Sequence, residues 1–288
     1  MISGKTNVCG VIGCPIEHTI SPLMHNFYAG ETGLDLAYLP FLVQPEQVEA
    51  AVRGAFALNI KGLNVTVPHK QEVLPYLAGL DEAAFVIGAV NTLVRTKEGY
   101  QGYNTDAAGL HRAMQEEEVT ITGRTCILLG AGGAAKAAAY LLAKEGAKKI
   151  YVLNRSVEKA QQLAGYIRQT LGYQPIEAGS LAAWRQIDEN SCLAVQTTSV
   201  GMYPRVDDIL IDDPEFYEKL HTAIDIIYTP AETGFMRMAA GAKTMNGLTM
   251  LLYQGVAAFE LWYPEITLSE ELIEKAKQLL IRHLEGQA

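Results

Sequence analysis

The side chains of this sequence best suited to chemistry are polar groups at the ends of predicted strands. Asn64 and Thr66 alternate along a strand predicted for Gly62 to Val67, so both point to one face of it. Polar side chains that face inward from a buried strand are costly unless they are hydrogen-bonded, which favours a ligand beside them. Lys70 follows at the corner between this strand and a short helix predicted for Gln71 to Leu77. Its ammonium could stabilise and then protonate a carbonyl oxygen that gains negative charge, although a lysine at such a corner is more often a solvated charge.

A second cluster, His18-Thr19-Ile20-Ser21-Pro22, offers two hydroxyl groups. Ser21 could be the N-cap of a helix predicted for Pro22 to Gly33, with the proline in its first position. One hydroxyl suffices for a cap, however. Because Thr19 and Ser21 alternate along the chain, both hydroxyls could face one ligand.

Two more clusters carry amide and carboxylate groups, namely Asn91-Thr92 and Gly102-Tyr-Asn104-Thr-Asp106. Asp106 could merely cap a helix predicted for Asp106 to Glu117. A carboxylate beside Lys70 would instead favour the charged ammonium and keep it a proton donor. Open α/β sheets bind their ligands at strand ends and loop starts, which is where all of these clusters lie.

A separate pattern indicates a dinucleotide site. A predicted buried strand, Cys126 to Leu129, runs into Gly130-x-Gly132-x-x-Ala135, and a predicted helix follows from Lys136 to Gly146. The first glycine permits the tight turn, the second lets the backbone approach a pyrophosphate, and Ala135 keeps the helix close to the strand. The pyrophosphate would bind at the positive end of the helix dipole. The alternative is a buried strand that ends in a flexible glycine loop, but strand, glycines, helix and next strand follow in the required order.

The next predicted strand, Lys149 to Leu153, distinguishes the two nicotinamide cofactors. An NAD site usually has an acidic residue at this strand end to accept from the ribose 2′-hydroxyl, and the sequence here is Asn154-Arg155-Ser156. Arg155 and Lys159 can instead bind a 2′-phosphate, which favours NADP. Ser156 could simply be an N-cap, and Lys159 a surface charge.

Composition limits the class of protein. The 288 residues suffice for two domains, and with 49% hydrophobic and 19% charged residues they describe a soluble globular chain. A net charge of −9 argues against nucleic acid or an anionic membrane as the main partner. No apolar run approaches the roughly 20 residues of a membrane span, and the first residues lack the core of a signal peptide.

The unpaired cysteines indicate a reducing cytoplasm. Cys9, Cys14 and His18 could be imagined as metal ligands, but their spacing fits no known site, so no metal is expected.

The order of predicted elements indicates an α/β protein. The first part adds strands Val8 to Gly13 and Ala37 to Val43, a helix Glu46 to Leu58, and a hairpin of Ala89 to Arg95 with Tyr100 to Tyr103. Its alternation predicts a parallel sheet. Later strands are Cys192 to Gln196, Ala223 to Ile227 and Ala242 to Met245, and helices Leu248 to Trp262 and Ser269 to Leu284 close the chain. We predict an α/β substrate domain (1–106 and 248–288) and a Rossmann-type dinucleotide domain (107–247), with the C-terminal helices packing back on the first domain and the cleft.

Taken together, the motifs resemble those of the shikimate dehydrogenase family. The first part of the chain carries His18-Thr-x-Ser-Pro22, Asn64-Val-Thr-x-Pro-His-Lys70, Gly88-Ala-Val-Asn-Thr92 and Gly102-Tyr-Asn-Thr-Asp106. The rest carries Gly130-Ala-Gly-Gly-Ala134, Asn154-Arg155, Thr198-Ser199-x-Gly201-Met202, Asp225-x-x-Tyr228 and Gly247-Leu-x-Met250-Leu-x-x-Gln254. The resemblance spans nearly the full chain in the family's order.

This resemblance implies a cytoplasmic oxidoreductase, monomeric or homodimeric, that reduces 3-dehydroshikimate to shikimate with NADPH in aromatic biosynthesis. The implied catalytic pair is Lys70 and Asp106. The implied substrate-binding residues are Thr19, Ser21, Asn64, Thr66, Lys70, Asn91, Asp106, Tyr228 and Gln254. The implied cofactor-binding residues are Gly130, Ala131, Gly132, Gly133, Ala134, Asn154, Arg155, Ser156, Lys159, Thr198, Ser199, Gly201, Met202, Ile226, Gly247 and Met250.

Two other functions stay open at this point. A quinate/shikimate dehydrogenase with dual substrate or NAD use shares most of these motifs, and Thr19, where the family usually has serine, leaves substrate preference open. An inactive paralogue that binds NADP(H) and regulates a partner would be expected to have lost Lys70 or Asp106, and both are present.

Overall fold

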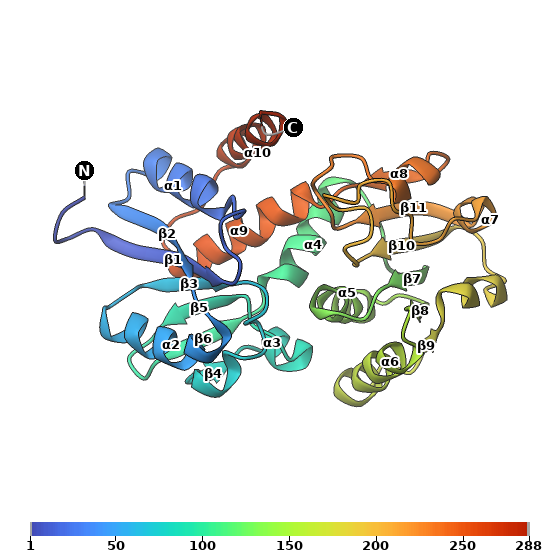
Figure 1. The fold of residues 1–288 in the computed structure, drawn as a ribbon, viewed down its shortest axis with the longest axis horizontal. Helices are drawn as coiled ribbons and strands as arrows, with labels where there is room; N and C mark the ends of the chain where they lie inside the picture. The colour runs from blue at the N-terminus through green and yellow to red at the C-terminus, as the bar shows by residue number, and fades with distance from the viewer. Residues whose placement is uncertain (1, 287–288) are drawn as a thin grey trace. The chain divides into compact units, whose positions relative to one another are not determined.

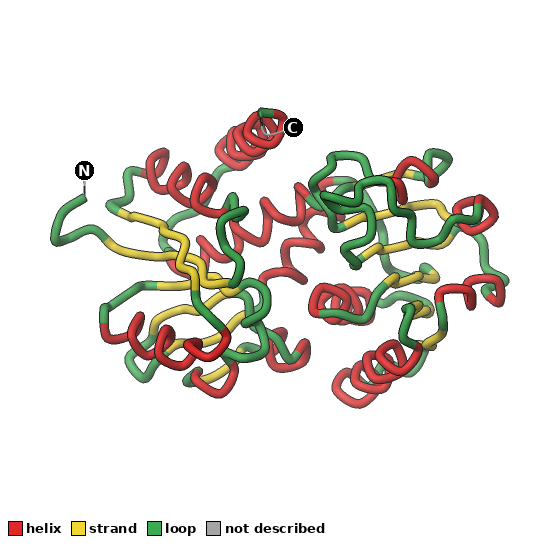
Figure 2. The backbone as a smooth tube through the Cα atoms, viewed as in Figure 1, coloured by secondary structure: helices red, strands yellow, loops and turns green. Residues whose placement is uncertain are grey.

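The structure, a computed structural model, describes residues 2–286. It divides into two compact units, one made of Met1–Gly109 with Leu252–Ala288 and the other of Leu110–Leu251. Each unit contains its own six-stranded sheet flanked by helices (Figure 1, Figure 2). Within residues 2–286, no helix is both long enough and apolar enough to cross a membrane.

The sheet of the first unit has the strand order β2-β1-β3-β5-β6-β4. Its elements are β1 (Asn7–Gly13), α1 (Ser21–Thr32), β2 (Leu36–Leu42), α2 (Val48–Ala57), β3 (Gly62–Val65), β4 (Gly79–Leu80), α3 (Glu82–Ile87), β5 (Thr92–Arg95) and β6 (Tyr100–Tyr103), with α9 (Leu248–Trp262) and α10 (Glu270–Glu285) from the end of the chain. Strands β2, β1 and β3 are parallel, whereas β5 runs antiparallel to both β3 and β6. The sheet is therefore mixed rather than parallel throughout, because the predicted hairpin supplies two of its strands.

Prolines shorten two elements that the sequence pattern predicts to be longer. Strand β3 ends at Val65, two residues before the predicted end, since Pro68 has no N–H to donate to a ladder. The helix predicted for Gln71 to Leu77 is replaced by turns and a short 3-10 helix, Leu74–Tyr76, because Pro75 interrupts helical hydrogen bonding there. The loop after β3 thus brings Lys70 back to the sheet, where its carbonyl accepts from Val90 N at 2.8 Å.

The two faces of β3 meet different helices. Leu63 and Val65 belong to the apolar cluster that α2 covers. Gly62 and Asn64 point to the opposite face, where the indole of Trp262 from α9 lies against Gly62 and donates to Leu93 O at 2.9 Å. Figure 1 shows α1 and α9 on this side of the sheet and α2 on the other. The C-terminal helices pack on the first unit as predicted, α10 against α1.

The sheet of the second unit is parallel throughout, in the order β12-β11-β10-β7-β8-β9. Its elements are β7 (Thr125–Leu129), α5 (Gly133–Lys144), β8 (Lys149–Leu153), α6 (Val157–Leu171), β9 (Ile176–Gly179), β10 (Cys192–Gln196), α7 (Pro214–Glu218), β11 (Leu220–Asp225), α8 (Gly234–Met238) and β12 (Lys243–Met245); α4 (Thr105–Glu116) leads into it. Figure 1 shows α5 and α6 on one side of the sheet and α7 and α8 on the other. The strand order reverses between β7 and β10, and such a reversal is where open α/β sheets bind their ligands.

Candidate active site

Lys70 and Asp106 form an ion pair, as the sequence predicts for a catalytic pair. Lys70 Nζ donates to Asp106 Oδ2 at 2.6 Å, although the two residues lie 36 positions apart in the chain. Their side chains are 25% and 11% exposed, so the pair is shielded but can still be reached from solvent. Asn91 Nδ2 donates to the other carboxylate oxygen at 2.8 Å. Each oxygen of Asp106 therefore has one donor, which fixes the plane of the carboxylate.

Asp106 does not cap its helix. Helix α4 begins at Thr105, and Asn104 Oδ1 accepts from Asp106 N at 3.1 Å, which is the contact expected of a capping residue. The alternative that Asp106 serves only as a cap is therefore wrong. Its side chain is directed to Lys70 and Asn91 instead.

The amides of Asn64 and Asn91 join the pair to a buried polar network. Asn64 Nδ2 donates to Asn91 O and to Thr92 Oγ1, both at 3.2 Å. Asn91 Oδ1 accepts from the backbone N–H of Thr105 at 2.7 Å. The Tyr38 hydroxyl donates to Asn64 Oδ1 at 2.7 Å. Four predicted site residues thus share one network with three that were not assigned to the site from the sequence. Of these, Thr92 and Thr105 lie within the polar clusters quoted above, whereas Tyr38 was not singled out at all.

Ser21 is the first residue of α1 and not its N-cap. The cap position is Ile20, and no side chain accepts a capping hydrogen bond there, so that alternative for Ser21 is wrong. The hydroxyls of Thr19 and Ser21 lie 3.3 Å apart, as expected for two groups that face one ligand. Burial raises the pKa of Tyr38 well above its ordinary value, whereas a hydrogen bond with Ser21 lowers it. Tyr38 is therefore a neutral hydroxyl group between the Thr19–Ser21 pair and Asn64.

The remaining predicted substrate residues lie at three other places. Thr66 follows directly after β3, and its methyl packs so closely over Gly13 that a Cβ on that glycine would lie 2.4 Å from it. Gln254 is half-buried on α9. Tyr228 belongs to the second unit, in the segment after β11, and burial raises its pKa.

The glycine-rich turn of the second unit has the geometry that a phosphate site needs. Gly130 has φ +117°, and a Cβ there would lie 2.5 Å from Thr197 Oγ1, so this position requires glycine on both grounds. Gly132 is the N-cap of α5, which begins at Gly133, three residues before its predicted start. A Cβ on either of these exposed glycines would meet nothing within 4 Å. The N-terminus of α5 is therefore open to an anion, and Ala131 and Ala134 flank it.

The strand ends beside this turn carry the other predicted cofactor residues. Asn154, Arg155 and Ser156 follow β8, where Ser156 Oγ caps α6 by accepting from Lys159 N at 3.4 Å. The capping role considered for Ser156 is therefore confirmed. Arg155 and Lys159 are both exposed. The remaining residues predicted to bind the cofactor lie in three segments, which follow β10, β11 and β12. They are Thr198, Ser199, Gly201, Met202, Ile226, Gly247 and Met250.

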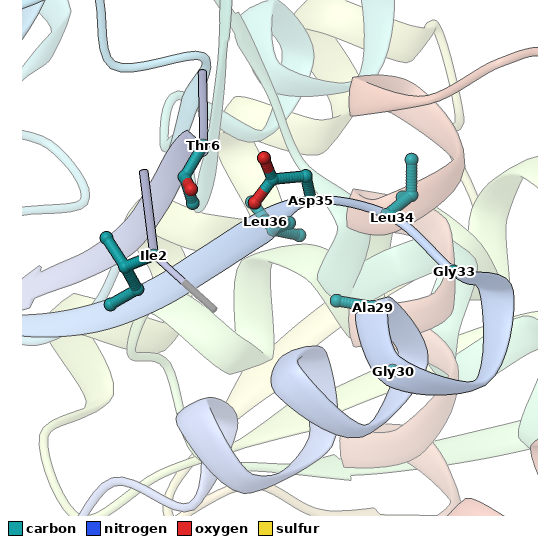
Figure 3. A pocket seen from close by; sticks show the side chains of 8 residues that line it. All are labelled: Ile2, Thr6, Ala29, Gly30, Gly33, Leu34, Asp35 and Leu36. Carbon is teal, nitrogen blue, oxygen red and sulfur yellow. The ribbon is translucent and has the colours of Figure 1, made fainter. Parts of the chain in front are cut away.

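A surface hollow of about 350 Å³ lies elsewhere on the first unit (Figure 3). It is lined by Ile2, Thr6 and the segment from the end of α1 to the start of β2, and none of the predicted site residues contributes to it. Within residues 2–286 there is also no group of three or more His, Cys, Asp or Glu side chains that could hold a metal ion. The predicted site residues lie instead in the polar network, at the glycine-rich turn and at the neighbouring strand ends.

Family models of three shikimate dehydrogenase domains match the chain. The substrate binding domain matches residues 11–93, the shikimate/quinate 5-dehydrogenase domain residues 112–186, and the C-terminal domain residues 247–276. The chain belongs to the shikimate dehydrogenase family.

Individual members of the family are similar over nearly the full chain. A relative from Desulforamulus reducens named shikimate dehydrogenase (NADP(+)) is 46% identical over 275 residues, 91% of each chain. A crystal structure of a shikimate dehydrogenase in complex with NADP+ has a TM-score of 0.86 at 38% identity and covers 96% of both chains. Another, from Listeria monocytogenes in complex with shikimate and NAD, has a TM-score of 0.89 at 32% identity over 97% of this chain and 98% of that one.

Proposed function

We propose that this protein is an NADP-dependent shikimate dehydrogenase, which catalyses the reversible reduction of 3-dehydroshikimate to shikimate in the pathway to chorismate and the aromatic amino acids. The observation that carries the proposal is the Lys70–Asp106 ion pair, held at 2.6 Å within a network of neutral amides and hydroxyls, in a chain of this family. The relatives' names supply the substrate and the cofactor. The ion pair supports the assignment of Lys70 as the proton donor, since its ammonium is oriented by Asp106 and is 25% exposed.

Lys70 is the proposed general acid of the reduction. As the substrate carbonyl is reduced, its oxygen gains negative charge, which the ammonium of Lys70 stabilises and then neutralises by giving up a proton. Asp106 and Asn91 orient Lys70 through the contacts described above. In the oxidation of shikimate the same group takes the proton back.

Apart from the Lys70–Asp106 ion pair, the proposed lining is neutral, which suits a small anion with several hydroxyl groups. The hydroxyls of Thr19 and Ser21 bind the carboxylate of the substrate in this proposal, and the polar groups of Asn64, Thr66, Asn91, Asp106 and Gln254 pair with its ring hydroxyls. Neutral donors and acceptors can satisfy each group without adding buried charge. Tyr228, a residue of the second unit, is also assigned to substrate binding in this proposal.

NADPH would supply the hydride for the reduction and leave as NADP⁺, and the second unit would supply its binding site. The open N-terminus of α5 fits a pyrophosphate, since Gly132 and Gly133 have no side chain to fill the space in front of it. The exposed Arg155 and Lys159 fit the 2′-phosphate. We assign residues 1–106 and 248–288 to substrate binding and residues 107–247 to NADP binding.

Reduced-nicotinamide absorbance tests the proposal directly. The purified protein is assayed with shikimate or quinate against NADP⁺ or NAD⁺. We expect turnover with shikimate and NADP⁺ only. Comparable turnover with quinate or NAD⁺ would assign the protein to the dual-specificity dehydrogenases. Binding of NADPH without turnover of any pair would instead support the regulatory function.

A further inference from the structure

One buried charged group of the second unit has no part in the proposed chemistry. Asp225, the last residue of β11, is fully buried and lies opposite the fully buried Gln196, the last residue of β10. Its carboxylate accepts from Thr233 Oγ1 at 2.7 Å, from Ile227 N at 3.0 Å, and from Gln196 Nε2 at 3.3 and 3.4 Å. Every polar partner of the carboxylate in these contacts is a donor, which is the arrangement that a buried carboxylate needs.

The orientation of Gln196 is fixed by the loop that follows it. Its Oε1 accepts from Thr198 N, and its Nε2 donates to Val200 O at 3.1 Å. A flip of this amide would place Nε2 against the donor Thr198 N and Oε1 against the acceptor Val200 O, so both hydrogen bonds would be lost. Gln196 therefore directs its Nε2, and not its Oε1, to the carboxylate of Asp225.

Through these contacts the Asp225–Gln196 pair connects several segments of the proposed cofactor site. Gln196 holds the loop after β10, and Asp225 holds the segment after β11 through the N–H of Ile227. Ile227 O in turn accepts from Gly247 N at 2.9 Å, and a Cβ on Gly247 would lie 1.9 Å from Ile226 O. The segment after β12 is thereby packed directly on the one after β11.

We infer that Asp225, acting with Gln196, is a positioning residue that holds the loops after β10, β11 and β12 in their cofactor-binding geometry. A dinucleotide fold has two mononucleotide-binding halves, and these loops belong to the half across the switch point from β8, which is the nicotinamide half of the proposed site. The inference rests on the proposed function, because the loops concerned are those assigned to NADP there. Asp225 touches neither the cofactor nor the substrate in this view. It acts through the backbone of the segments after β10, β11 and β12, whereas the adenosine side of the site, at Arg155 after β8, does not depend on it.

The role of the carboxylate is tested by Asp225→Asn, which replaces it with an amide side chain. It has nearly the same shape, but its NH₂ group must face one of the donors that now point at the carboxylate. Thr233→Val is a milder variant that removes one donor to Asp225, together with the cap that Thr233 Oγ1 provides to α8 by accepting from Met236 N at 3.4 Å. Thr222→Val is the matched control, because it removes the hydroxyl of another buried threonine of this unit, which bonds to His221 Nδ1 at 2.9 Å instead.

The measurement is the affinity of each purified variant for two ligands by fluorescence and calorimetric titration. NADPH reaches both sides of the proposed site, whereas adenosine 2′,5′-bisphosphate reaches only the adenosine side. We expect the dissociation constant of NADPH to rise about tenfold to a hundredfold in Asp225→Asn and less in Thr233→Val. The affinity for the bisphosphate should not change in either, and Thr222→Val should match the wild type for both ligands.

Several results would overturn the inference. One is an unchanged affinity of Asp225→Asn for NADPH. Another is an equal loss of affinity for NADPH and for the bisphosphate, which would indicate a general structural role. Should Asp225→Asn not fold, the comparison of Thr233→Val with Thr222→Val decides by the same criterion. Failure of the wild type to bind either ligand would overturn the proposed function together with the inference, and the wild-type titration identifies that case.

Discussion

Lys70 owes its position to residues that are distant in the sequence. The loop after β3 is hydrogen-bonded to the segment before β5, because Val90 N donates to Lys70 O. The carboxylate of Asp106, at the start of α4, accepts from the Lys70 ammonium. The proposed proton donor is therefore oriented by parts of the fold that assemble around it. A side chain placed in this way can be removed without disturbing the strands that position it.

Lys70→Ala should lower the turnover of shikimate oxidation by about 10²- to 10⁴-fold, the usual contribution of general acid–base groups. The steady-state rate with NADP⁺ at saturating shikimate measures the effect. Lys97→Ala, which removes an exposed lysine of the same unit, should leave turnover unchanged. Wild-type turnover in Lys70→Ala would remove this residue from the mechanism.

Tyr38 is a second residue whose contribution can be isolated, because Tyr28 offers a matched control. Both tyrosines are buried and contact the ring of His25. Among residues 2–286 the Tyr28 hydroxyl has no hydrogen-bond partner, whereas Tyr38 donates to Asn64 Oδ1. Tyr38→Phe leaves the Asn64 amide without its donor, at a cost of about 1–2 kcal/mol. We expect the KM for shikimate to rise about 5- to 30-fold with the KM for NADP⁺ unchanged.

Tyr28→Phe removes a hydroxyl from the same aromatic cluster and should leave both KM values as they are. Equal effects of the two substitutions, or a parallel rise in both KM values for Tyr38→Phe, would show that the hydroxyl serves only the packing of the first unit.

The sequence predicts some of these residues and not others for a physical reason. Asn64 could be predicted because a polar side chain that faces inward from a buried strand is costly unless it is hydrogen-bonded. Lys70 and Asp106 were predicted through the family resemblance, because by residue type alone they fit a solvated charge and a helix cap equally well. Tyr38 could not, since a tyrosine in a predicted strand fits an apolar core equally well. Its hydroxyl reaches Asn64 only because β1 pairs with both β2 and β3. The pairing of Asp225 with Gln196 depends in the same way on the register of β10 against β11.

At the scale of elements, the position of α9 depends on a contact between a glycine and a tryptophan. The five-membered ring of Trp262 lies against Gly62 of β3, and a Cβ on that glycine would lie 2.0 Å from Nε1 and 2.3 Å from Cδ1 of the indole. The ring is buried and held by its bond to Leu93 O, so it cannot move aside. The approach of α9 to the sheet therefore depends on the missing side chain at position 62.

Gly62→Ala should destabilise the protein by about 3 kcal/mol, the upper end of the usual cost of overpacking. Gly54→Ala is the control, since Gly54 lies inside α2 and a Cβ there would meet nothing within 4 Å. That substitution should stabilise the protein by about 0.5–1 kcal/mol through helix propensity. Urea denaturation of both variants measures the difference, and a Gly62→Ala variant as stable as the wild type would contradict this account of α9.

Helices and strands were predicted correctly where the period of the hydrophobic pattern and the length of the segment indicate the same type of element. The strands Lys149–Leu153 and Cys192–Gln196 and the helix Leu248–Trp262 were predicted with the bounds that the structure has. Short elements such as α3 and β9 were missed, because a few residues carry too little of a period to be recognised. The helix predicted across Pro75 was wrong, and the proline itself was the signal that should have excluded it.

For the molecule as a whole, the path of the chain makes its two units unequal. The second is continuous from Leu110 to Leu251 and contains a complete parallel sheet with helices on both sides. The first is assembled from two segments, and its second segment supplies Trp262 and Phe259, both buried. Without that segment, one face of the first sheet loses α9, one of the two helices that cover it, and only α1 remains there.

We therefore expect a fragment of residues 110–251 to fold alone and a fragment of residues 1–109 not to. The longer fragment should show a cooperative thermal transition by circular dichroism and should bind adenosine 2′,5′-bisphosphate as tightly as the full chain. Residues 1–109 should show no such transition, because truncation exposes the aromatic cluster around His25 that α9 covers. Linking residues 252–288 to this fragment through a flexible connection should restore the transition. A cooperative transition in residues 1–109 alone would mean that α9 is dispensable to the first sheet, and its absence in residues 110–251 would mean that the second unit needs the first to fold.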